Sequence, residues 1–246
     1  MKILFNNLLS SATLSALGAS VNYPLANLNH PFLKKKFQQS VDGSSGMPDA
    51  SALTLTWPSD QTIDFIAAGY SNATAFTLKL YDSADALLST VTFTNAEMGA
   101  TFTAVTGVRS AKLLLDDESG DNPMTVYLGG LGIGLATDIG RPIYDWTPEY
   151  LDNSFGANSL DGQTQGQYIE PLRNPKFSFI TASKTLVDAV RSGVNTLGRY
   201  GAVWVIPFAA ALTTEKPLYC TIPDGVESPG RDGLLYTFSL TFQEAR

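Results

Sequence analysis

The chain has a single cysteine, Cys220, and a single histidine, His30, among its 246 residues. One cysteine excludes an internal disulfide and any zinc site built from several thiolates. One histidine offers neither a metal cluster nor an evident nucleophile–base pair, and no serine lies in a GxSxG turn. We therefore expect no catalytic residue, no cofactor and no metal site, and we predict that the chain is not an enzyme. The apolar neighbours of Cys220 predict that it is a buried core residue.

Charged residues are scarce, at 16% of the chain, and acidic residues outnumber basic ones, giving a net charge of −7. A nucleic-acid-binding protein needs a basic face to neutralise phosphates. The only basic run, Lys34–Lys36, is typical of a solvated loop, so no nucleic-acid specificity is expected. No apolar run approaches the roughly 18 residues of a membrane-spanning helix. We therefore expect no insertion into a membrane. Asn6 and Asn7 interrupt the apolar N-terminus, which we interpret as a first strand rather than a signal peptide.

The first region, up to about residue 138, contains short runs of alternating apolar and polar residues. Turn-forming residues, among them Gly69 and Gly107, separate these runs. Several short strands at this spacing indicate an antiparallel sandwich or barrel. The predicted strands are 53–57, 62–67, 75–81, 87–94, 101–105, 110–116 and 124–128.

The second region, residues 139–246, combines strands with the one clear helix pattern of the sequence. Apolar residues fall on one face of residues 184–198, with Ser183 as the N-cap and Gly198 or Gly201 at the end. Strands are predicted at 176–181, 202–206, 218–222 and 234–242. We therefore predict a mainly β protein with two domains, 1–138 and 139–246, the second a small β barrel or sandwich with one helix packed on a sheet.

Three motifs invite a chemical interpretation. The glycines of residues 130–134 have GxGxG spacing instead of the dinucleotide-binding GxGxxG, and no helix follows, so a glycine-bearing strand is favoured. Asp116, Asp117 and nearby acidic residues could bind Ca²⁺ or act in acid–base chemistry, but their neighbours indicate a solvated turn. Trp57 and Phe76 are expected in the core, whereas Tyr70 is the best candidate for an exposed aromatic that stacks on a sugar. The candidate ligand or interface residues are Tyr70, Asp116, Asp117 and Trp146.

The first region resembles the discoidin-type, galactose-binding-like jelly rolls found in phage proteins. The phrases that carry the resemblance are Ser10–Ser15, Tyr23–Leu28, Leu53–Leu55, Thr77–Ser83, Ala111–Leu115 and Leu128–Gly134. The resemblance implies an antiparallel jelly-roll sandwich over residues 1–138, in a family whose sugar or lipid site lies in loops at one end. Residues 36–39 depart from the Trp-Arg phrase that the family often has there.

The second region resembles tail-tip proteins of long-tailed phages, especially distal tail hub subunits. The phrases that carry it are Arg141–Trp146, Phe177–Phe179, Val203–Pro207 and Tyr236–Arg246. The resemblance implies a structural protein of the virion, a distal tail or baseplate hub subunit assembled in the host cytoplasm. Such a subunit forms a homo-oligomeric ring, a hexamer or trimer, and contacts neighbouring tail proteins. The alternative is a carbohydrate-binding module that attaches to a host glycan.

Overall fold

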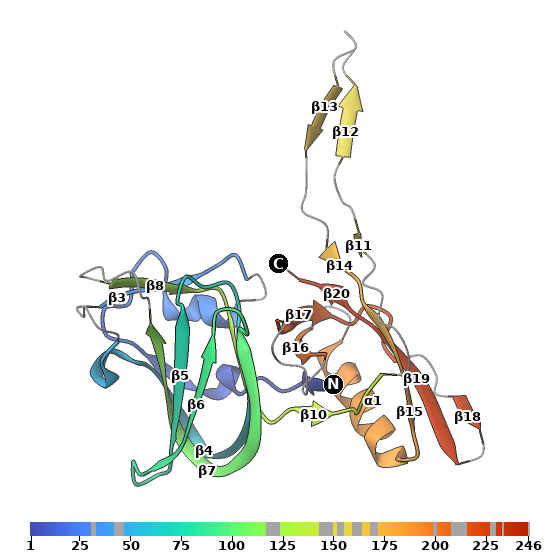
Figure 1. The fold of residues 1–246 in the computed structure, drawn as a ribbon, viewed down its shortest axis with the longest axis horizontal. Coiled ribbons are helices and arrows are strands. Elements are labelled where there is room, and N and C mark those ends of the chain that lie inside the picture. Colours follow the sequence, from blue (N-terminus) through green and yellow to red (C-terminus); the bar gives the residue numbers. More distant parts are fainter. Residues whose placement is uncertain are drawn as a thin grey trace. The chain divides into compact units, whose positions relative to one another are not determined.

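The computed structural model is mainly β, with one α-helix among the residues it describes, which confirms the predicted fold class (Figure 1). It describes the chain except residues 31–32, 42–46, 117–123, 143–149, 152–154, 159–163, 168–171, 199–200, 208–215, 227–229, 233 and 246, and only the backbone of 150–151, 155–158, 164–167, 172–173 and 230–232. Two compact units are present, unit 1 with residues 1–138 and 203–219, and unit 2 with residues 139–202 and 220–245. The domain boundary at residue 138 stays a prediction. No described helix has both the length and the apolar character that a membrane span requires.

The largest sheet of unit 1 is antiparallel, in the order β2-β4-β7-β5-β6, with β9 paired to the second half of β4. Along β5, buried and half-buried residues alternate, which confirms the period of two that the sequence shows. The strands are β2 Thr13–Ser15, β4 Leu53–Ala68, β5 Ala75–Tyr81, β6 Leu87–Thr94, β7 Gly99–Asp116 and β9 Leu131–Gly134.

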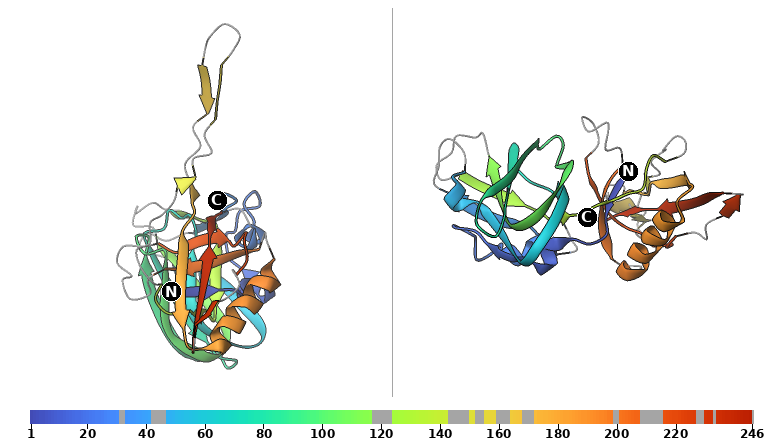
Figure 2. Two further views of the ribbon diagram at one scale, coloured as in Figure 1. Left: turned by 90° about the vertical axis from the view of Figure 1, so that its right-hand side faces the viewer. Right: turned by 90° about the horizontal axis from the view of Figure 1, so that it is seen from below.

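Strands β4 and β7 are longer than the sequence predicts. The predicted strands 53–57 and 62–67 belong to one continuous strand, β4, and the predicted strands 101–105 and 110–116 belong to another, β7. The prediction of a turn at Gly107 is therefore wrong. The register between β4 and β7 shifts three times between Thr56 and Phe65, and Gly107 has a φ of +75°. Bulges and a left-handed glycine let a paired strand bend without ending, and both strands are visibly curved (Figure 2).

The second layer of unit 1 is the antiparallel pair β3 (Phe37–Val41) and β8 (Met124–Leu128). One side of this pair faces the first sheet, and Phe37, Val126 and Leu128 are fully buried there. Gln38 and Tyr127 lie opposite each other in the register, so the pleat places both on the outer side. The two layers enclose the main core, and the candidate site lies on the outer side of the second layer.

Two aromatic residues predicted to be core residues are confirmed. Trp57 is 1% exposed, and its indole N–H donates to the Leu8 carbonyl at 2.9 Å. Phe76 is also 1% exposed and stacks on Phe93 with ring centroids 4.7 Å apart. The buried state predicted for Cys220, in unit 2, is likewise confirmed.

The N-terminus forms a strand, as predicted. Strand β1 (Lys2–Leu4) lies between β10 (Thr137–Asp138) and β16 (Ala202–Ile206) in an antiparallel arrangement. The Lys2 ammonium contacts the nearly buried Asp64 carboxylate at 2.6 Å. Short 3-10 helices connect the strands of unit 1, at Leu8–Ser11 (η1), Leu25–Asn29 (η2) and Asp49–Ser51 (η3).

Unit 2 contains an antiparallel sheet in the order β15-β19-β18, with α1 packed along one face (Figures 1 and 2). Among the described residues no set of strands closes into a barrel, so the arrangement is an open sheet covered by a helix. The elements of this sheet are β15 Lys176–Thr181, β18 Gly230–Asp232, β19 Leu235–Thr241 and α1 Lys184–Leu197. The remaining strands are β11 Tyr150–Leu151 paired with β14 Leu172–Arg173, β12 Phe155–Asn158 paired with β13 Thr164–Gln167, and β17 Leu218–Thr221 paired with β20 Gln243–Glu244.

Helix α1 follows its predicted signals. The Ser183 hydroxyl accepts the Leu186 N–H at 3.2 Å, so it is the N-cap. Val187, Val190 and Val194 are buried on one face. Gly198 ends the helix with a φ of +66°, a conformation that glycine adopts without strain.

Candidate functional site

Tyr70 is an exposed aromatic residue on a firmly held segment. It is 62% exposed, as predicted. The Gly69 N–H donates to the Gly130 carbonyl at 2.9 Å, and the Gly129 N–H donates to the Tyr70 carbonyl at 2.7 Å. The backbone of Tyr70 is therefore fixed on both sides while its ring meets solvent. A residue whose backbone is already fixed loses little further backbone entropy when its side chain binds a ligand.

The side chains of Ser71 and Asn72 attach the same segment to β8. The Ser71 hydroxyl donates to the Tyr127 carbonyl at 2.6 Å. The Asn72 side-chain carbonyl accepts the Tyr127 N–H at 2.8 Å, and its amide donates to the Thr125 carbonyl at 2.9 Å. The Asn72 amide thus takes the place of a neighbouring peptide group. Both backbone groups of Tyr127 are bonded to this segment, which fixes Tyr127 relative to Tyr70.

The rings of Tyr70 and Tyr127 stack, with centroids 5.5 Å apart and planes inclined by 27°. The Lys36 ammonium lies 4.1 Å from the centroid of the Tyr127 ring, within the range of a cation–π interaction. Lys36 is half-buried, and its backbone carbonyl accepts the Asn27 side-chain amide at 2.9 Å. We call Lys36, Tyr70 and Tyr127 the tyrosine platform.

The turn that carries Lys34, Lys35 and Lys36 packs against Tyr70 through Gly129. A Cβ added to Gly129 would lie 2.2 Å from the Leu33 carbonyl oxygen and 3.2 Å from the Cβ and carbonyl oxygen of Tyr70. Only a residue without a side chain permits this approach of the two backbones. The lysine turn and Tyr70 are therefore neighbours in space.

Burial, and then the hydrogen bond with the Tyr70 phenol, raise the pKa of Tyr127 above its ordinary value of 10.0. The Tyr127 phenol is therefore neutral at physiological pH. A neutral phenol can both donate and accept a hydrogen bond. The platform thus presents an aromatic face, two phenol groups and one ammonium group.

The other predicted site residues are placed as follows. Asp116 ends β7, and its backbone carbonyl accepts the Thr74 N–H at 2.7 Å and the Thr74 hydroxyl at 3.1 Å. This bonds Asp116 to the chain segment that follows the platform, without bringing its carboxylate to Tyr70 by any described contact. Asp117 and Trp146 lie outside the described residues. A ligand or interface role for these three residues stays a prediction.

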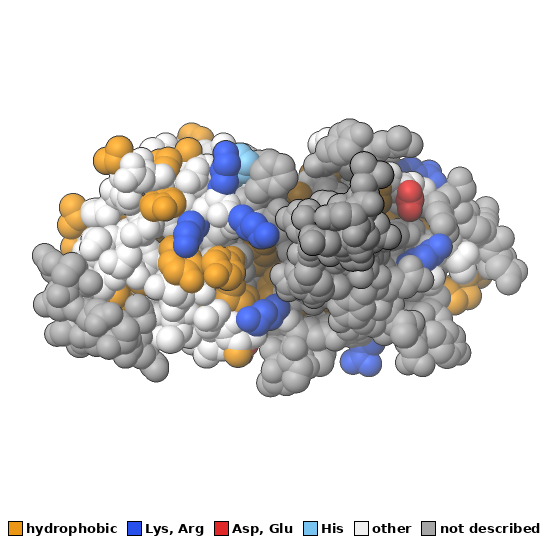
Figure 3. All heavy atoms as spheres, turned by 90° about the horizontal axis from the view of Figure 1, so that it is seen from above, with side chains coloured by type: hydrophobic (Ala, Val, Ile, Leu, Met, Phe, Trp, Pro, Cys, Tyr) orange, Lys and Arg blue, Asp and Glu red, His pale blue; other side chains and the backbone are white. Residues whose placement is uncertain are grey.

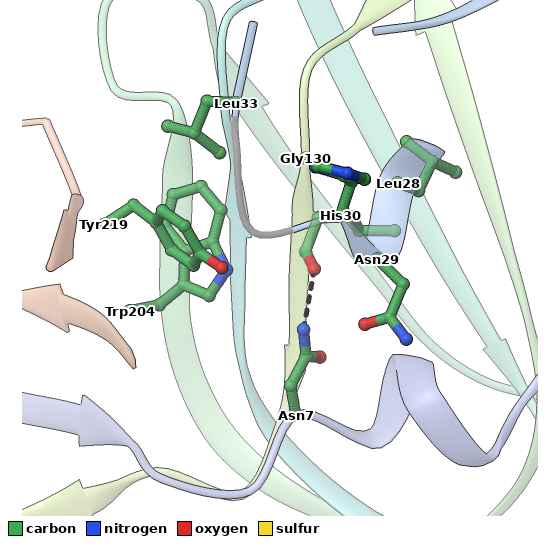
Figure 4. A pocket seen from close by; sticks show the side chains of 9 residues that line it. Asn7, Leu28, Asn29, His30, Leu33, Gly130, Trp204 and Tyr219 are labelled. Atoms are coloured by element: carbon green, nitrogen blue, oxygen red, sulfur yellow. Dashed lines mark hydrogen bonds between the residues drawn. The ribbon is translucent and has the colours of Figure 1, made fainter. Parts of the chain in front are cut away.

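A small pocket of unit 1 lies between η2, β9 and the side chains of Trp204 and Tyr219 (Figure 4). The Asn7 amide donates to the Leu131 carbonyl at 2.9 Å on one side of it. The space open to the centre of a water-sized sphere is about 20 Å³, which suffices for a single water molecule. The pocket is therefore too small to hold a sugar ring.

The glycine motif of residues 130–134 has a packing role. The glycines of 130–134 lie in and beside β9, and a Cβ on Gly132 would lie 2.3 Å from the Trp204 ring. This confirms the glycine-bearing strand, in which the missing side chain makes room for an indole. Among the described residues, no group of three or more His, Cys, Asp or Glu could hold a metal ion.

Two members of the platform were missed from the sequence. The apolar positions 124, 126 and 128 alternate, which is a signal that Tyr127 points outward. Lys34 and Lys35 are exposed, as expected for a solvated loop, but for Lys36 that expectation is wrong because it lies over the Tyr127 ring. No local signal links residue 36 to residue 127, since the contact depends on the pairing of β3 with β8.

No protein-family model and no curated protein matches the sequence. Among solved structures, the chain is similar to the family 32 CBM from C. perfringens NanJ in complex with galactose, at 14% identity and a TM-score of 0.41 over 54% of this chain and 97% of that one. A Streptococcus pneumoniae fucose binding module is similar at 9% identity and a TM-score of 0.38, over 52% and 94% of the two chains. Chitosan-binding module 1 from a Paenibacillus sp. IK-5 chitosanase/glucanase is similar at 14% identity and a TM-score of 0.40, over 52% and 98%. These three are carbohydrate-binding modules and not phage tail proteins, and at such identities their ligands do not transfer to this chain.

Proposed function

We propose that unit 1 binds carbohydrate and that the tyrosine platform contacts the sugar. The observation that carries this proposal is the ring of Tyr70, 62% exposed, stacked on Tyr127 and held by backbone hydrogen bonds on both sides. Tyrosine combines a large apolar ring with a polar tip, and it suits a ligand that has an apolar face and a polar edge. A sugar ring is such a ligand, since its C–H groups form the face and its hydroxyls the edge.

The polar groups around the rings support the same ligand class. Sugar hydroxyls both donate and accept hydrogen bonds, and the two phenols of the platform can do both. Lys36 adds a donor above the Tyr127 ring, and Gln38, opposite Tyr127 in the β3–β8 register, is half-buried on the same outer side. The outer side of β3–β8 therefore offers an aromatic face with donors and acceptors beside it.

The test is to apply the labelled full-length chain to an array of immobilised glycans and to repeat it with Tyr70→Ala. The full chain is used because unit 1 includes residues 203–219. Tyr81→Ala is the matched control, since Tyr81 is a half-buried tyrosine of the other sheet with the Lys112 ammonium 5.4 Å from its ring.

We expect the wild type and Tyr81→Ala to bind the same glycans, and Tyr70→Ala to bind them about tenfold more weakly, as is common for an aromatic anchor. Circular dichroism spectra of the three proteins check that each is folded. The proposal is wrong if the wild type binds no glycan, or if both substitutions weaken binding equally.

An assembly role is the second candidate function, and strand β6 supports it. This strand is the last in the order of its described sheet, and Leu87 and Leu88 are 56% and 40% exposed. An edge strand with exposed leucines is suited to pairing with another chain.

In line with the resemblance of the second region, we propose a ring-forming subunit of a phage tail tip, in contact with neighbouring tail proteins of the virion. Native mass spectrometry should then show a trimer or hexamer that Leu88→Lys disrupts, whereas a monomer at micromolar concentration would contradict this role.

A further inference from the structure

The surroundings of the tyrosine platform are basic in a chain whose net charge is −7. Residues 1–41 contain neither aspartate nor glutamate, and of their four lysines Lys2 is paired with Asp64, which leaves the three lysines of the turn. The segments 69–74 and 124–130, which carry the two tyrosines of the platform, contain no acidic residue either. The local charge therefore has the opposite sign to the charge of the whole protein.

The three lysines of the turn are available to a ligand. Lys34 and Lys35 are exposed, and the Lys36 ammonium rests over the Tyr127 ring. The ion pairs within the described residues involve other lysines and arginine, namely Lys2, Lys79, Arg109 and Lys184. In Figure 3, Lys and Arg side chains surround hydrophobic side chains on this face of unit 1, and no described Asp or Glu is visible among them.

The backbone holds these charges beside the aromatic rings. The close contact of Gly129 with the Leu33 carbonyl and with Tyr70 brings the turn against the platform. The Asn27 side-chain amide donates to the carbonyl of Lys36 and so fixes the end of the turn. A ligand stacked on Tyr70 therefore meets a cluster of positive charge at its edge.

We infer that the ligand of the tyrosine platform is an anionic carbohydrate, a sugar polymer that carries carboxylate, sulfate or phosphate groups. The sugar ring contacts Tyr70, and the anionic groups contact Lys34, Lys35 and Lys36. This inference rests on the proposed carbohydrate-binding function and adds the charge of the ligand to it. Single-stranded nucleic acid also combines rings with anionic groups, and an oligothymidylate is therefore included in the test.

The test is a calorimetric titration of the full chain with pairs of polymers that differ in charge alone. Polygalacturonate is compared with its methyl ester, dextran sulfate with dextran, and phosphomannan with mannan, so that the three anionic groups are distinguished. The variant Lys34→Gln/Lys35→Gln removes two charges from the turn. Lys79→Gln/Arg109→Gln is the matched control, since it removes two charges from the other sheet.

We expect at least one charged polymer to bind about tenfold more tightly than its neutral partner at low salt, with the difference shrinking as salt screens the charges. The Lys34→Gln/Lys35→Gln variant should bind that polymer about fivefold more weakly, in line with two exposed charge contacts. The control variant and the wild type should bind it equally.

Four other outcomes overturn the inference. If the wild type binds charged and neutral polymers equally, the ligand is a neutral sugar, and the proposed carbohydrate-binding function stands. If it binds no polymer of either kind, the inference fails, and the proposed function fails with it if the glycan array is silent too. If Tyr70→Ala leaves the binding of charged polymers intact, both the inference and the proposed function fail. If an oligothymidylate binds more tightly than every sugar polymer, the basic surface serves nucleic acid instead.

Discussion

Replacing Gly129 with alanine tests whether the platform depends on the close approach of the lysine turn to Tyr70. The new Cβ would lie 2.2 Å from the Leu33 carbonyl oxygen, whereas Cβ contacts below 3.0 Å are essentially never seen, so this oxygen must move by about 0.8 Å. The obstacle is backbone and cannot rotate away. Leu33 is itself packed, since its Cδ2 would lie 2.6 Å from a Cβ on Gly130.

Forcing an extra methyl group into a packed site costs about 1–3 kcal/mol, so we expect Gly129→Ala to lower the free energy of unfolding by about 2 kcal/mol. For a chain of this size, that corresponds to a melting temperature about 4–8 °C lower. Differential scanning calorimetry measures the melting temperature, and urea titration followed by tryptophan fluorescence measures the free energy. Glycan binding should weaken in the same variant, because Lys36 and Tyr70 are pushed apart.

Gly107→Ala is the control for Gly129→Ala. Its Cβ would meet nothing within 4 Å, and the φ of +75° is the only source of strain. We expect it to cost about 1 kcal/mol through the left-handed backbone and to leave glycan binding unchanged. A Gly129→Ala protein with wild-type stability and wild-type binding would refute the steric argument.

Three further substitutions test other parts of the structure. Asn72→Ala removes two hydrogen bonds to β8 and should cost about 2 kcal/mol in urea unfolding; an unchanged midpoint would contradict the role given to this amide. Ser183→Ala removes the N-cap of α1 and should cost about 1 kcal/mol, while the exposed Thr185→Ala should cost less; equal losses would count against the cap. Burial raises the pKa of Tyr219 above 10.0, so the folded chain holds this proton more tightly than the unfolded chain. The resulting stability is present below about pH 10 and is lost as the pH rises through the raised pKa. When the pH is raised from about 8 to 11, the urea midpoint of Tyr219→Phe should therefore fall less than that of the wild type. Equal decreases of the two midpoints would be the contrary result.

The elements of the fold that depend on local pattern could be predicted from the sequence. The alternation along β5 and the apolar face of α1 between Ser183 and Gly198 are both present in the structure. The continuity of β4 and β7 could not be predicted, because a bulge resembles a turn in the sequence. The contact of Trp204 with Gly132 could not be predicted either, since it joins distant parts of the chain.

The candidate site was predictable to a smaller extent. The turn residues around Tyr70 indicated that it is exposed, and the alternation of 124–128 contained the signal for Tyr127. The position of Lys36 depends on the β3–β8 register and on a close backbone contact at Gly129. Neither leaves a local pattern, so a run of three lysines is indistinguishable from a solvated loop until the strands are paired.

The central claim, that the tyrosine platform binds carbohydrate, is tested most directly by backbone-amide NMR of the full chain during titration with the polymer that binds most tightly. Tyr70, Asn72, Tyr127 and Lys36 should shift in proportion to bound ligand, while Tyr81 and Lys112 on the other sheet should stay in place. If the amide signals of these four residues do not shift and signals elsewhere in the chain do, the account is contradicted.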